Sequence, residues 1–180
     1  MTTTKFNVPT REEVSTNNQA LFDTLQKGLG FIPNTYATIA LSSTALENYM
    51  TFTNAKTSLS KKEKEVINLV VSQVNSCDYC LAAHTAIGKL NSFNEEQIIE
   101  IRKGSITFDN RFDALAKFAK AIAINKGHID NATLENLLDQ GFSKENVMDI
   151  ILAVADISIT NYVNNITKVP IDFPPASPLD

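Results

Sequence analysis

The two cysteines of this chain lie close together, and a histidine and a glutamate flank them. They are Cys77 and Cys80; His84 follows the second cysteine by four residues, and Glu65 precedes the first by twelve. A disulfide that closes so short a loop restrains the unfolded chain by only roughly 2 kcal/mol, before any strain is subtracted. The spacing therefore favours two thiols that open and close in a redox cycle over a structural crosslink.

A helix that begins near Cys77 would place Cys77, Cys80 and His84 on one face, because they stand at helical spacing. A helix N-terminus and a neighbouring imidazole both lower the pKa of a thiol, which is about 8.5 without them. A Glu65 carboxylate beside this helix could orient His84 or exchange a proton with it. We therefore predict a nucleophilic thiol site formed by these four residues.

The chemistry that suits such a site is reduction of a hydroperoxide. A thiolate attacks a peroxide oxygen and becomes a sulfenic acid, the partner thiol condenses with it to a disulfide, and a dithiol reductant resets the pair. Cys80 is predicted to react with the peroxide because it is nearer His84, and Cys77 to resolve it because the start of a helix is more exposed. The reverse assignment stays open, because a thiol at the N-terminus feels the helix dipole more strongly.

These residues carry a family resemblance. Glu65 and the segment 77–84, CDYCLAAH, resemble the E-x11-C-x2-C-x3-H signature of alkylhydroperoxidase D-like (AhpD-like) proteins of the carboxymuconolactone decarboxylase superfamily. Segments 30–34, 69–75, 161–162 and 171–174 also resemble its peroxidase-related members. The resemblance covers most of the chain.

The resemblance implies an all-helical fold and a homo-oligomer, either a trimer or a hexamer. It also implies a peroxidase without cofactor or metal, a dihydrolipoamide-like dithiol as reductant, and a proton relay from Glu65 and His84 to Cys80. Two departures bear on rate and substrate. Tyr79 stands between the cysteines where some members have histidine, and Asn164-Asn165 stands where related chains often have Asn-His.

Each of these residues also has a plainer interpretation. The cysteines could be small apolar residues of a buried helix, and His84 a hydrogen-bonded core residue. Glu65 could be a solvated residue in a run of Lys and Glu. Cys77, Cys80 and His84 could bind zinc with Glu65 as fourth ligand. Tyr79 could bind a substrate or merely cover the cysteines.

Three other functions compete with the peroxidase. A thiol redox sensor or disulfide carrier would exchange quickly with a partner protein and turn over peroxide slowly. A decarboxylase or isomerase acting on a small lactone would keep its activity with both cysteines replaced by serine. A metal-binding module without enzyme activity would hold a metal ion when purified.

The composition suits one ordinary globular domain. The chain has 180 residues, 43% hydrophobic and 20% charged, and a net charge of -4. Nothing in it favours nucleic acid or an anionic membrane as partner, and the N-terminus lacks an apolar signal segment, so we expect a cytoplasmic protein. We predict a single all-α domain over 1–180, because six glycines and apolar residues at i, i+3, i+4 leave little room for strands.

The pattern of apolar residues, caps and breakers predicts the helices that position the site. A capping box at Ser60 and Glu63 should start the helix that carries Glu65, and the next should run from about Cys77 to Leu90. Residues 169–180 should form an extended, proline-rich tail. An internal two-helix repeat, offset by 81 residues, is possible. The other expected helices lie within 10–29, after 34, after 44, and at 94–103, 111–125, 131–139 and 144–166.

Overall fold

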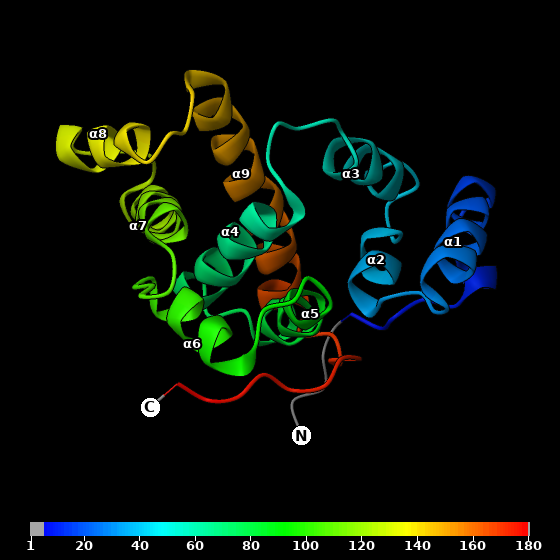
Figure 1. Cartoon of the computed structure of the whole chain (residues 1–180). Helices are drawn as coiled ribbons and strands as arrows, with labels where there is room; N and C mark the ends of the chain where they lie inside the picture. The colour runs from blue at the N-terminus through cyan, green and yellow to red at the C-terminus, as the bar shows by residue number, and fades with distance from the viewer. Residues whose placement is uncertain (1–5, 180) are drawn as a thin grey trace. The chain divides into compact units, whose positions relative to one another are not determined.

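Helices make up the regular structure of the chain. The computed structural model describes residues 6–179, and within this range it contains helices and no β-strand. The predicted all-α class is therefore confirmed. In chain order (Figure 1) the elements are a 3-10 helix η1 (Arg11–Glu13), α1 (Thr16–Leu29), α2 (Asn34–Ile39), α3 (Ala45–Thr53), α4 (Lys61–Val74), α5 (Asp78–Leu90), α6 (Glu95–Lys103), α7 (Asn110–Asn125), α8 (Asn131–Asp139) and α9 (Lys144–Thr167).

Within the described residues, contacts group the chain into two units. The first combines 6–56 with 162–172, and the second combines 57–161 with 173–179. The last turns of α9 therefore belong with the N-terminal helices, whereas the end of the tail belongs with the central helices. That the chain behaves as a single domain stays a prediction.

The first unit is held together by an apolar core and by polar contacts of its C-terminal segment. Its buried core side chains come from before α1 and from α1 to α3: Val14, Phe22, Ala37, Ile39, Ala40 and Leu46. The Thr35 hydroxyl donates a hydrogen bond to the Asn164 side-chain oxygen at 2.9 Å, and the backbone N–H of Asn34 donates to the Asp172 carboxylate at 2.7 Å. The Asn164-Asn165 departure thus falls within this unit.

Helix α4 is the central helix of the second unit. It contacts α5, α6 and α7, while α8 packs on α7; Figure 1 shows α7 to one side of α4 and α5 to the other. Its apolar side chains are fully buried at Val66, Ile67, Leu69, Val70 and Val71. Burying one such side chain stabilises a fold by about 1.5–3 kcal/mol, so α4 is a rigid support for whatever it carries.

The predicted capping box starts α4. Ser60 Oγ accepts a hydrogen bond from the Glu63 amide at 3.2 Å, and Glu63 Oε2 accepts one from the Ser60 amide at 2.7 Å. Arg111 of α7 donates to Glu63 Oε1 at 2.9 Å and to the Gln140 carbonyl at 2.9 Å. The Glu63 carboxylate therefore caps the N-terminus of α4 and also anchors α7 to it.

Helix α9 presents two different faces within the second unit. Ile150, Val154 and Ile157 point inward and are buried, whereas several apolar residues on the opposite face are exposed. By length and composition α9 could cross a membrane, with a mean hydropathy of 1.3 over its most apolar window, a third of which is buried. A core helix passes the same test, and the absence of a membrane partner stays a prediction.

The structure agrees with the predicted extended tail but not with the suggested two-helix repeat. From residue 168 to 179 the chain has no helix, as the prolines predict. The second copy of the repeat does not fold as two helices: α4 and α5 are separated by a turn at 75–77, whereas α9 continues without a break through the matching positions. The sequence pattern common to both copies thus reflects two buried helices rather than two equal helix pairs.

Candidate active site

The four predicted site residues all lie in the second unit. Glu65 is on α4, Cys80 and His84 are on α5, and Cys77 is the N-cap residue immediately before α5. Both cysteines are free thiols, and both are buried. The structure thus brings the four residues together, while their catalytic roles stay a prediction.

Capping holds the two cysteines together. Cys77 has extended backbone angles, φ -96 and ψ 93, and its sulfur accepts a hydrogen bond from the Cys80 amide at 3.3 Å. In this geometry the sulfur takes the position that a serine or aspartate oxygen occupies at other helix starts. The pair is therefore close because of the cap, rather than because both residues belong to one helical face.

The sequence prediction that Cys77 is the more exposed thiol is wrong. Cys77 is 0% exposed and Cys80 3%. The reason is the turn after α4: Ser76 adopts a left-handed conformation with φ 51, and the Cys77 amide donates to the Ser72 carbonyl at 3.0 Å. The chain is thereby folded back onto the end of α4, which covers Cys77.

Glu65 and His84 form a buried pair across α4 and α5. Glu65 Oε2 lies 2.9 Å from His84 Nδ1, and Asn68 donates to Glu65 Oε1 at 3.2 Å. Glu65 is only 6% exposed, so the interpretation of it as a solvated helix residue is wrong. The carboxylate fixes the ring orientation and leaves Nε2 as the nitrogen that can exchange a proton with the site.

The charge around His84 favours the imidazolium. Burial opposes the charged ring, but the Glu65 carboxylate outweighs burial through its charge and hydrogen bond, with smaller help from Cys80 and Asp156, so the pKa of His84 is raised. Asp156 lies on α9 and is half-buried. His84 is therefore a proton donor held ready beside the cysteines.

The two thiols are not equivalent. The hydrogen bond of Cys77 to the Cys80 side chain, burial and the charge of Cys80 all raise the pKa of Cys77 far above its usual range, against a smaller opposite effect of the Cys80 amide and Asn161. Cys77 therefore keeps its proton at neutral pH. This asymmetry favours Cys80 as the sulfur that carries negative charge.

Helix α9 contributes site residues that sequence reasoning did not assign. Thr160 Oγ1 lies 4.0 Å from Cys80 Sγ, and a hydrogen bond from the Asn161 side chain lowers the pKa of Cys77. Both are about 80 residues from the cysteines in sequence, so no local spacing marks them. The one available signal was the resemblance of segment 161–162 to peroxidase-related proteins.

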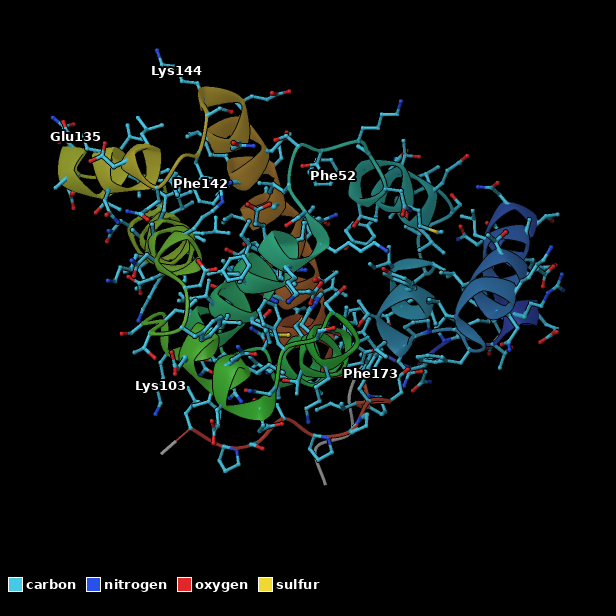
Figure 2. The ribbon with its side chains drawn as sticks, in the orientation of Figure 1. Phe52, Lys103, Glu135, Phe142, Lys144 and Phe173 are labelled. Carbon is cyan, nitrogen blue, oxygen red and sulfur yellow. The ribbon has the colours of Figure 1, made fainter. Side chains whose placement is uncertain are left out.

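Tyr79 lies between the cysteines in sequence and is itself buried, 6% exposed. Its ring meets the ring of Phe173 edge to face, with centroids 5.7 Å apart; Figure 2 shows Phe173, on the C-terminal tail, next to α5. The Arg102 guanidinium holds the tail further along by donating to the Ser177 carbonyl at 2.6 Å. Tyr79 is thus buried in contact with the tail, and whether it binds a substrate stays untested.

A metal centre is not apparent at this site. Among residues 6–179, no group of three or more His, Cys, Asp or Glu side chains has the arrangement to hold a metal ion. The zinc interpretation of Cys77, Cys80, His84 and Glu65 therefore has no support in the geometry.

Comparisons with known proteins agree with this arrangement. Residues 42–123, which contain all four site residues, match the model of the carboxymuconolactone decarboxylase family. A peroxidase-related protein from Silicibacter sp. TM1040 is similar in structure, with a TM-score of 0.81 and 26% identity over 97% of this chain and 93% of its own. Residues 42–123 thus resemble the carboxymuconolactone decarboxylase family, and nearly the whole chain shares its fold with a peroxidase-related protein.

Other solved structures share this fold at lower identity. One is the AhpD core of a peroxidase-related protein from Ralstonia eutropha JMP134, with a TM-score of 0.84 and 22% identity over 94% of this chain and 92% of its own. Another is the debrominase Bmp8, crystallised as a cysteine-to-alanine variant with 2,3,4-tribromopyrrole; its TM-score is 0.78 and its identity 18% over 95% of this chain and 93% of its own. No curated protein sequence matches the chain.

Proposed function

We propose that this AhpD-like chain reduces small hydroperoxides through a dithiol–disulfide cycle of Cys77 and Cys80. The observation that carries the proposal is a buried pair of free thiols beside His84, whose Nδ1 is held at 2.9 Å by the Glu65 carboxylate. The arrangement supplies a nucleophile, a resolving thiol and an acid–base group within one small region.

In the first step the Cys80 thiolate attacks the outer oxygen of the hydroperoxide. A sulfur–oxygen bond forms and the oxygen–oxygen bond breaks, so that Cys80 becomes a sulfenic acid, oxidised by two electrons, and the alkoxide leaves. His84 gives the alkoxide a proton, and the product is an alcohol. The raised pKa of Cys77 supports the assignment of Cys80 as the attacking sulfur, because a thiol that retains its proton is the weaker nucleophile.

In the second step Cys77 attacks Cys80. The Cys77 thiol loses its proton, a sulfur–sulfur bond forms, the sulfur–oxygen bond of the sulfenic acid breaks, and the hydroxide takes up a proton as water. A dithiol of the dihydrolipoamide type then reduces the disulfide by exchange and is itself oxidised. Reduction of the disulfide regenerates the Cys77 thiol and the Cys80 thiolate and leaves one proton of the dithiol over; His84, neutral since the first step, takes up this proton, which the Glu65 carboxylate favours.

Burial of the thiols bears on the competing functions. A disulfide carrier must present a sulfur to a folded partner, whereas both sulfurs here are buried. A small peroxide and a slender dithiol arm reach such a site more readily than a protein surface does. A lactone-converting enzyme has no need for the cysteines, although they occupy the centre of the site.

Reductive debromination of a small ring is the second candidate. The similarity in fold to Bmp8, solved with 2,3,4-tribromopyrrole, supports testing it. The same dithiol would supply two electrons, replacing a carbon–bromine bond by a carbon–hydrogen bond and releasing bromide as the disulfide forms. Bromide release from that pyrrole therefore belongs in the first assays.

We further propose that the enzyme works as a homo-oligomer in the cytoplasm, where cellular reductants keep the pair reduced. The exposed apolar side chains of α9, which include Met148 at 57% and Leu152 at 52%, support self-association. Neither nucleic acid nor a membrane is proposed as a partner.

The deciding experiment follows an organic hydroperoxide with excess dihydrolipoamide, comparing the native chain with Cys80→Ser and Cys77→Ser. We expect turnover to be lost in both variants, and a single stoichiometric oxidation to survive in Cys77→Ser alone. No turnover in the native chain, with the thiols still readily oxidised, would favour a carrier; lactone conversion that survives both substitutions would favour the decarboxylase type.

A further inference from the structure

Asn161 is a fully buried amide on α9 whose hydrogen-bonding capacity is used at the cysteine pair. Its Nδ2 donates to Ser72 Oγ at 3.0 Å, and its Oδ1 accepts from Asn75 Nδ2 at 2.9 Å. A hydrogen bond from its side chain also favours the charged form of Cys77 and lowers the pKa of that thiol. An asparagine has two N–H donors and a carbonyl oxygen with two lone pairs, so these three partners use both donors and one of the two acceptor positions.

The partners of Asn161 are the residues that place Cys77. Ser72 receives the Cys77 amide through its carbonyl at 3.0 Å, and Asn75 ends α4 immediately before the turn. The amide thus connects α9 to the C-terminal end of α4, immediately before the turn that carries the thiol. A side chain fixed by these two contacts holds its remaining N–H donor in one position, where it acts on the Cys77 sulfur.

We propose that Asn161 is a positioning residue for the disulfide-forming step: it holds the Cys77 sulfur beside Cys80 and stabilises that sulfur as a thiolate once Cys80 is oxidised. The inference rests on the proposed function for its place in the cycle. Its physical part, the stabilisation of a Cys77 thiolate, does not need any peroxide.

The timing follows from which groups act on Cys77. While Cys80 is a thiolate, its charge and hydrogen bond keep the proton on Cys77 and outweigh Asn161. Oxidation to sulfenic acid removes the negative charge from Cys80. The effects that remain in favour of a Cys77 thiolate are then the Asn161 hydrogen bond and the Cys80 amide at 3.3 Å, which is the first-turn donor of α5.

Other charged groups near the pair act on a different residue. Glu65 of α4, Cys80 of α5 and Asp156 of α9 all act on His84, which faces the Cys80 side of the site. Of these, only Cys80 is among the groups that shift the pKa of Cys77. Among the groups that shift the pKa of Cys77, Asn161 is therefore the one side chain outside α5 that favours the thiolate.

The experiment titrates Cys77 alone, in the full chain with Cys80→Ser. The ultraviolet absorbance of the thiolate is followed against pH, and the double variant with Cys77→Ser serves as blank for the tyrosines. Adding Asn161→Ala should move the titration to higher pH and leave roughly tenfold less thiolate at a given pH below the midpoint, the effect of one hydrogen bond to a charged sulfur.

Two further variants keep the test decisive. Ser72→Ala removes one partner that fixes Asn161 and should shift the titration in the same direction by less. Ser158→Ala is the matched control, because its hydroxyl on α9 donates to the Val154 carbonyl and not to Cys77. Equal titrations of all three would overturn the proposal; if Asn161→Ala does not fold, the comparison of Ser72→Ala with Ser158→Ala decides.

A second readout places the effect in the cycle. With one equivalent of hydroperoxide and otherwise native cysteines, Asn161→Ala should form the sulfenic acid at the native rate but close the disulfide roughly tenfold more slowly, so that dimedone traps more of it. Equal closing rates would overturn the role in the cycle. Absence of sulfenic acid in Cys77→Ser, where no disulfide can consume it, would instead refute the proposed peroxidase, with the titration result unaffected.

Discussion

The Glu65 carboxylate determines the state in which His84 meets the cysteines. A buried imidazole on its own would lose its proton readily, since burial disfavours the charged ring. The contact of 2.9 Å reverses this and raises the pKa of His84, so that the acid needed by a departing alkoxide is present when Cys80 attacks. One buried carboxylate thereby supplies a proton donor without itself approaching the sulfur.

Replacing Glu65→Gln should therefore lower the pKa of His84 and slow peroxide reduction by about 10²-fold or more, the usual contribution of a positioned acid. The alkaline limb of the rate profile should move to lower pH, because the imidazolium is lost sooner. The free energy of unfolding depends on pH for the same reason. Because the pKa of His84 is higher in the folded chain than its unfolded value of about 6.5, the Glu65–His84 pair stabilises the fold fully below that value, and this stabilisation is lost as pH rises through the folded-state pKa.

The measurement is a pH–rate profile together with nuclear magnetic resonance titration of the His84 ring. His128→Gln is the matched control, since His128 is the only other histidine and is exposed. An unchanged alkaline limb in Glu65→Gln would show that the pair has no part in the proton relay.

Among the site residues, the sequence could predict those that lie at a recognisable spacing from one another. It could not predict site residues that come from a distant part of the chain. Cys77, Cys80 and His84 lie within a few residues of one another, and Glu65 lies on the preceding helix, so spacing and charge identify them. Asn161 reaches the same site only through packing of α9 on the end of α4. Periodicity marks the buried face of a helix, but not which polar residue on it meets a thiol.

Local chemistry predicts the helices well where a cap is present. The Ser60–Glu63 box starts α4 as expected, and the segment Asn131–Asp139 forms α8 within its predicted bounds. The sequence analysis predicts that Cys77 and Cys80 lie close together, but it assigns this to a shared helical face. The structure brings them together by N-capping, which is hard to foresee because a cysteine sulfur rarely serves as an N-cap acceptor. The contact between Tyr79 and the tail could not be predicted, since an extended segment has no periodicity to show its buried side.

The tail packs through the ring of Phe173 on Tyr79, which stands between the two cysteines in sequence. We expect Tyr79, held by this ring, to shield the thiols, so Phe173→Ala should loosen that shield by removing the edge-to-face partner. We expect a bulky aromatic disulfide reagent to modify the thiols severalfold faster, while a small alkylating reagent changes less. Stopped-flow absorbance with both reagents measures the difference.

Phe108→Ala is the control for this experiment. It also removes a half-exposed ring from an aromatic cluster of the second unit, formed with Phe93 and Phe112, but leaves Tyr79 untouched. Equal acceleration in both variants would mean general loosening of the unit. Acceleration in neither would mean that Tyr79 alone covers the thiols and that the tail serves another purpose.

For the whole molecule, α9 raises the question of what covers its outer face. A helix that is apolar on both sides is ordinarily buried on both sides. The inner face of α9 is buried within the second unit, but Met148, Ile151, Leu152 and Ile159 are 40% to 57% exposed and fall on one stripe at helical spacing. A second copy of this stripe is a suitable cover, because apolar surfaces of this kind pair with themselves in symmetric oligomers.

Leu152→Glu should therefore break the homo-oligomer, because pairing two copies would bury a carboxylate in an apolar contact. Light scattering after size exclusion gives the mass of the native chain and the variant at equal concentration. Leu90→Glu is the control: among the described residues Leu90 is the most exposed large apolar side chain, at 85%, and it lies at the end of α5, outside the stripe on α9. A native chain that is already monomeric refutes the oligomer itself, whereas an oligomer that survives Leu152→Glu places the interface elsewhere and leaves the outer face of α9 to another partner.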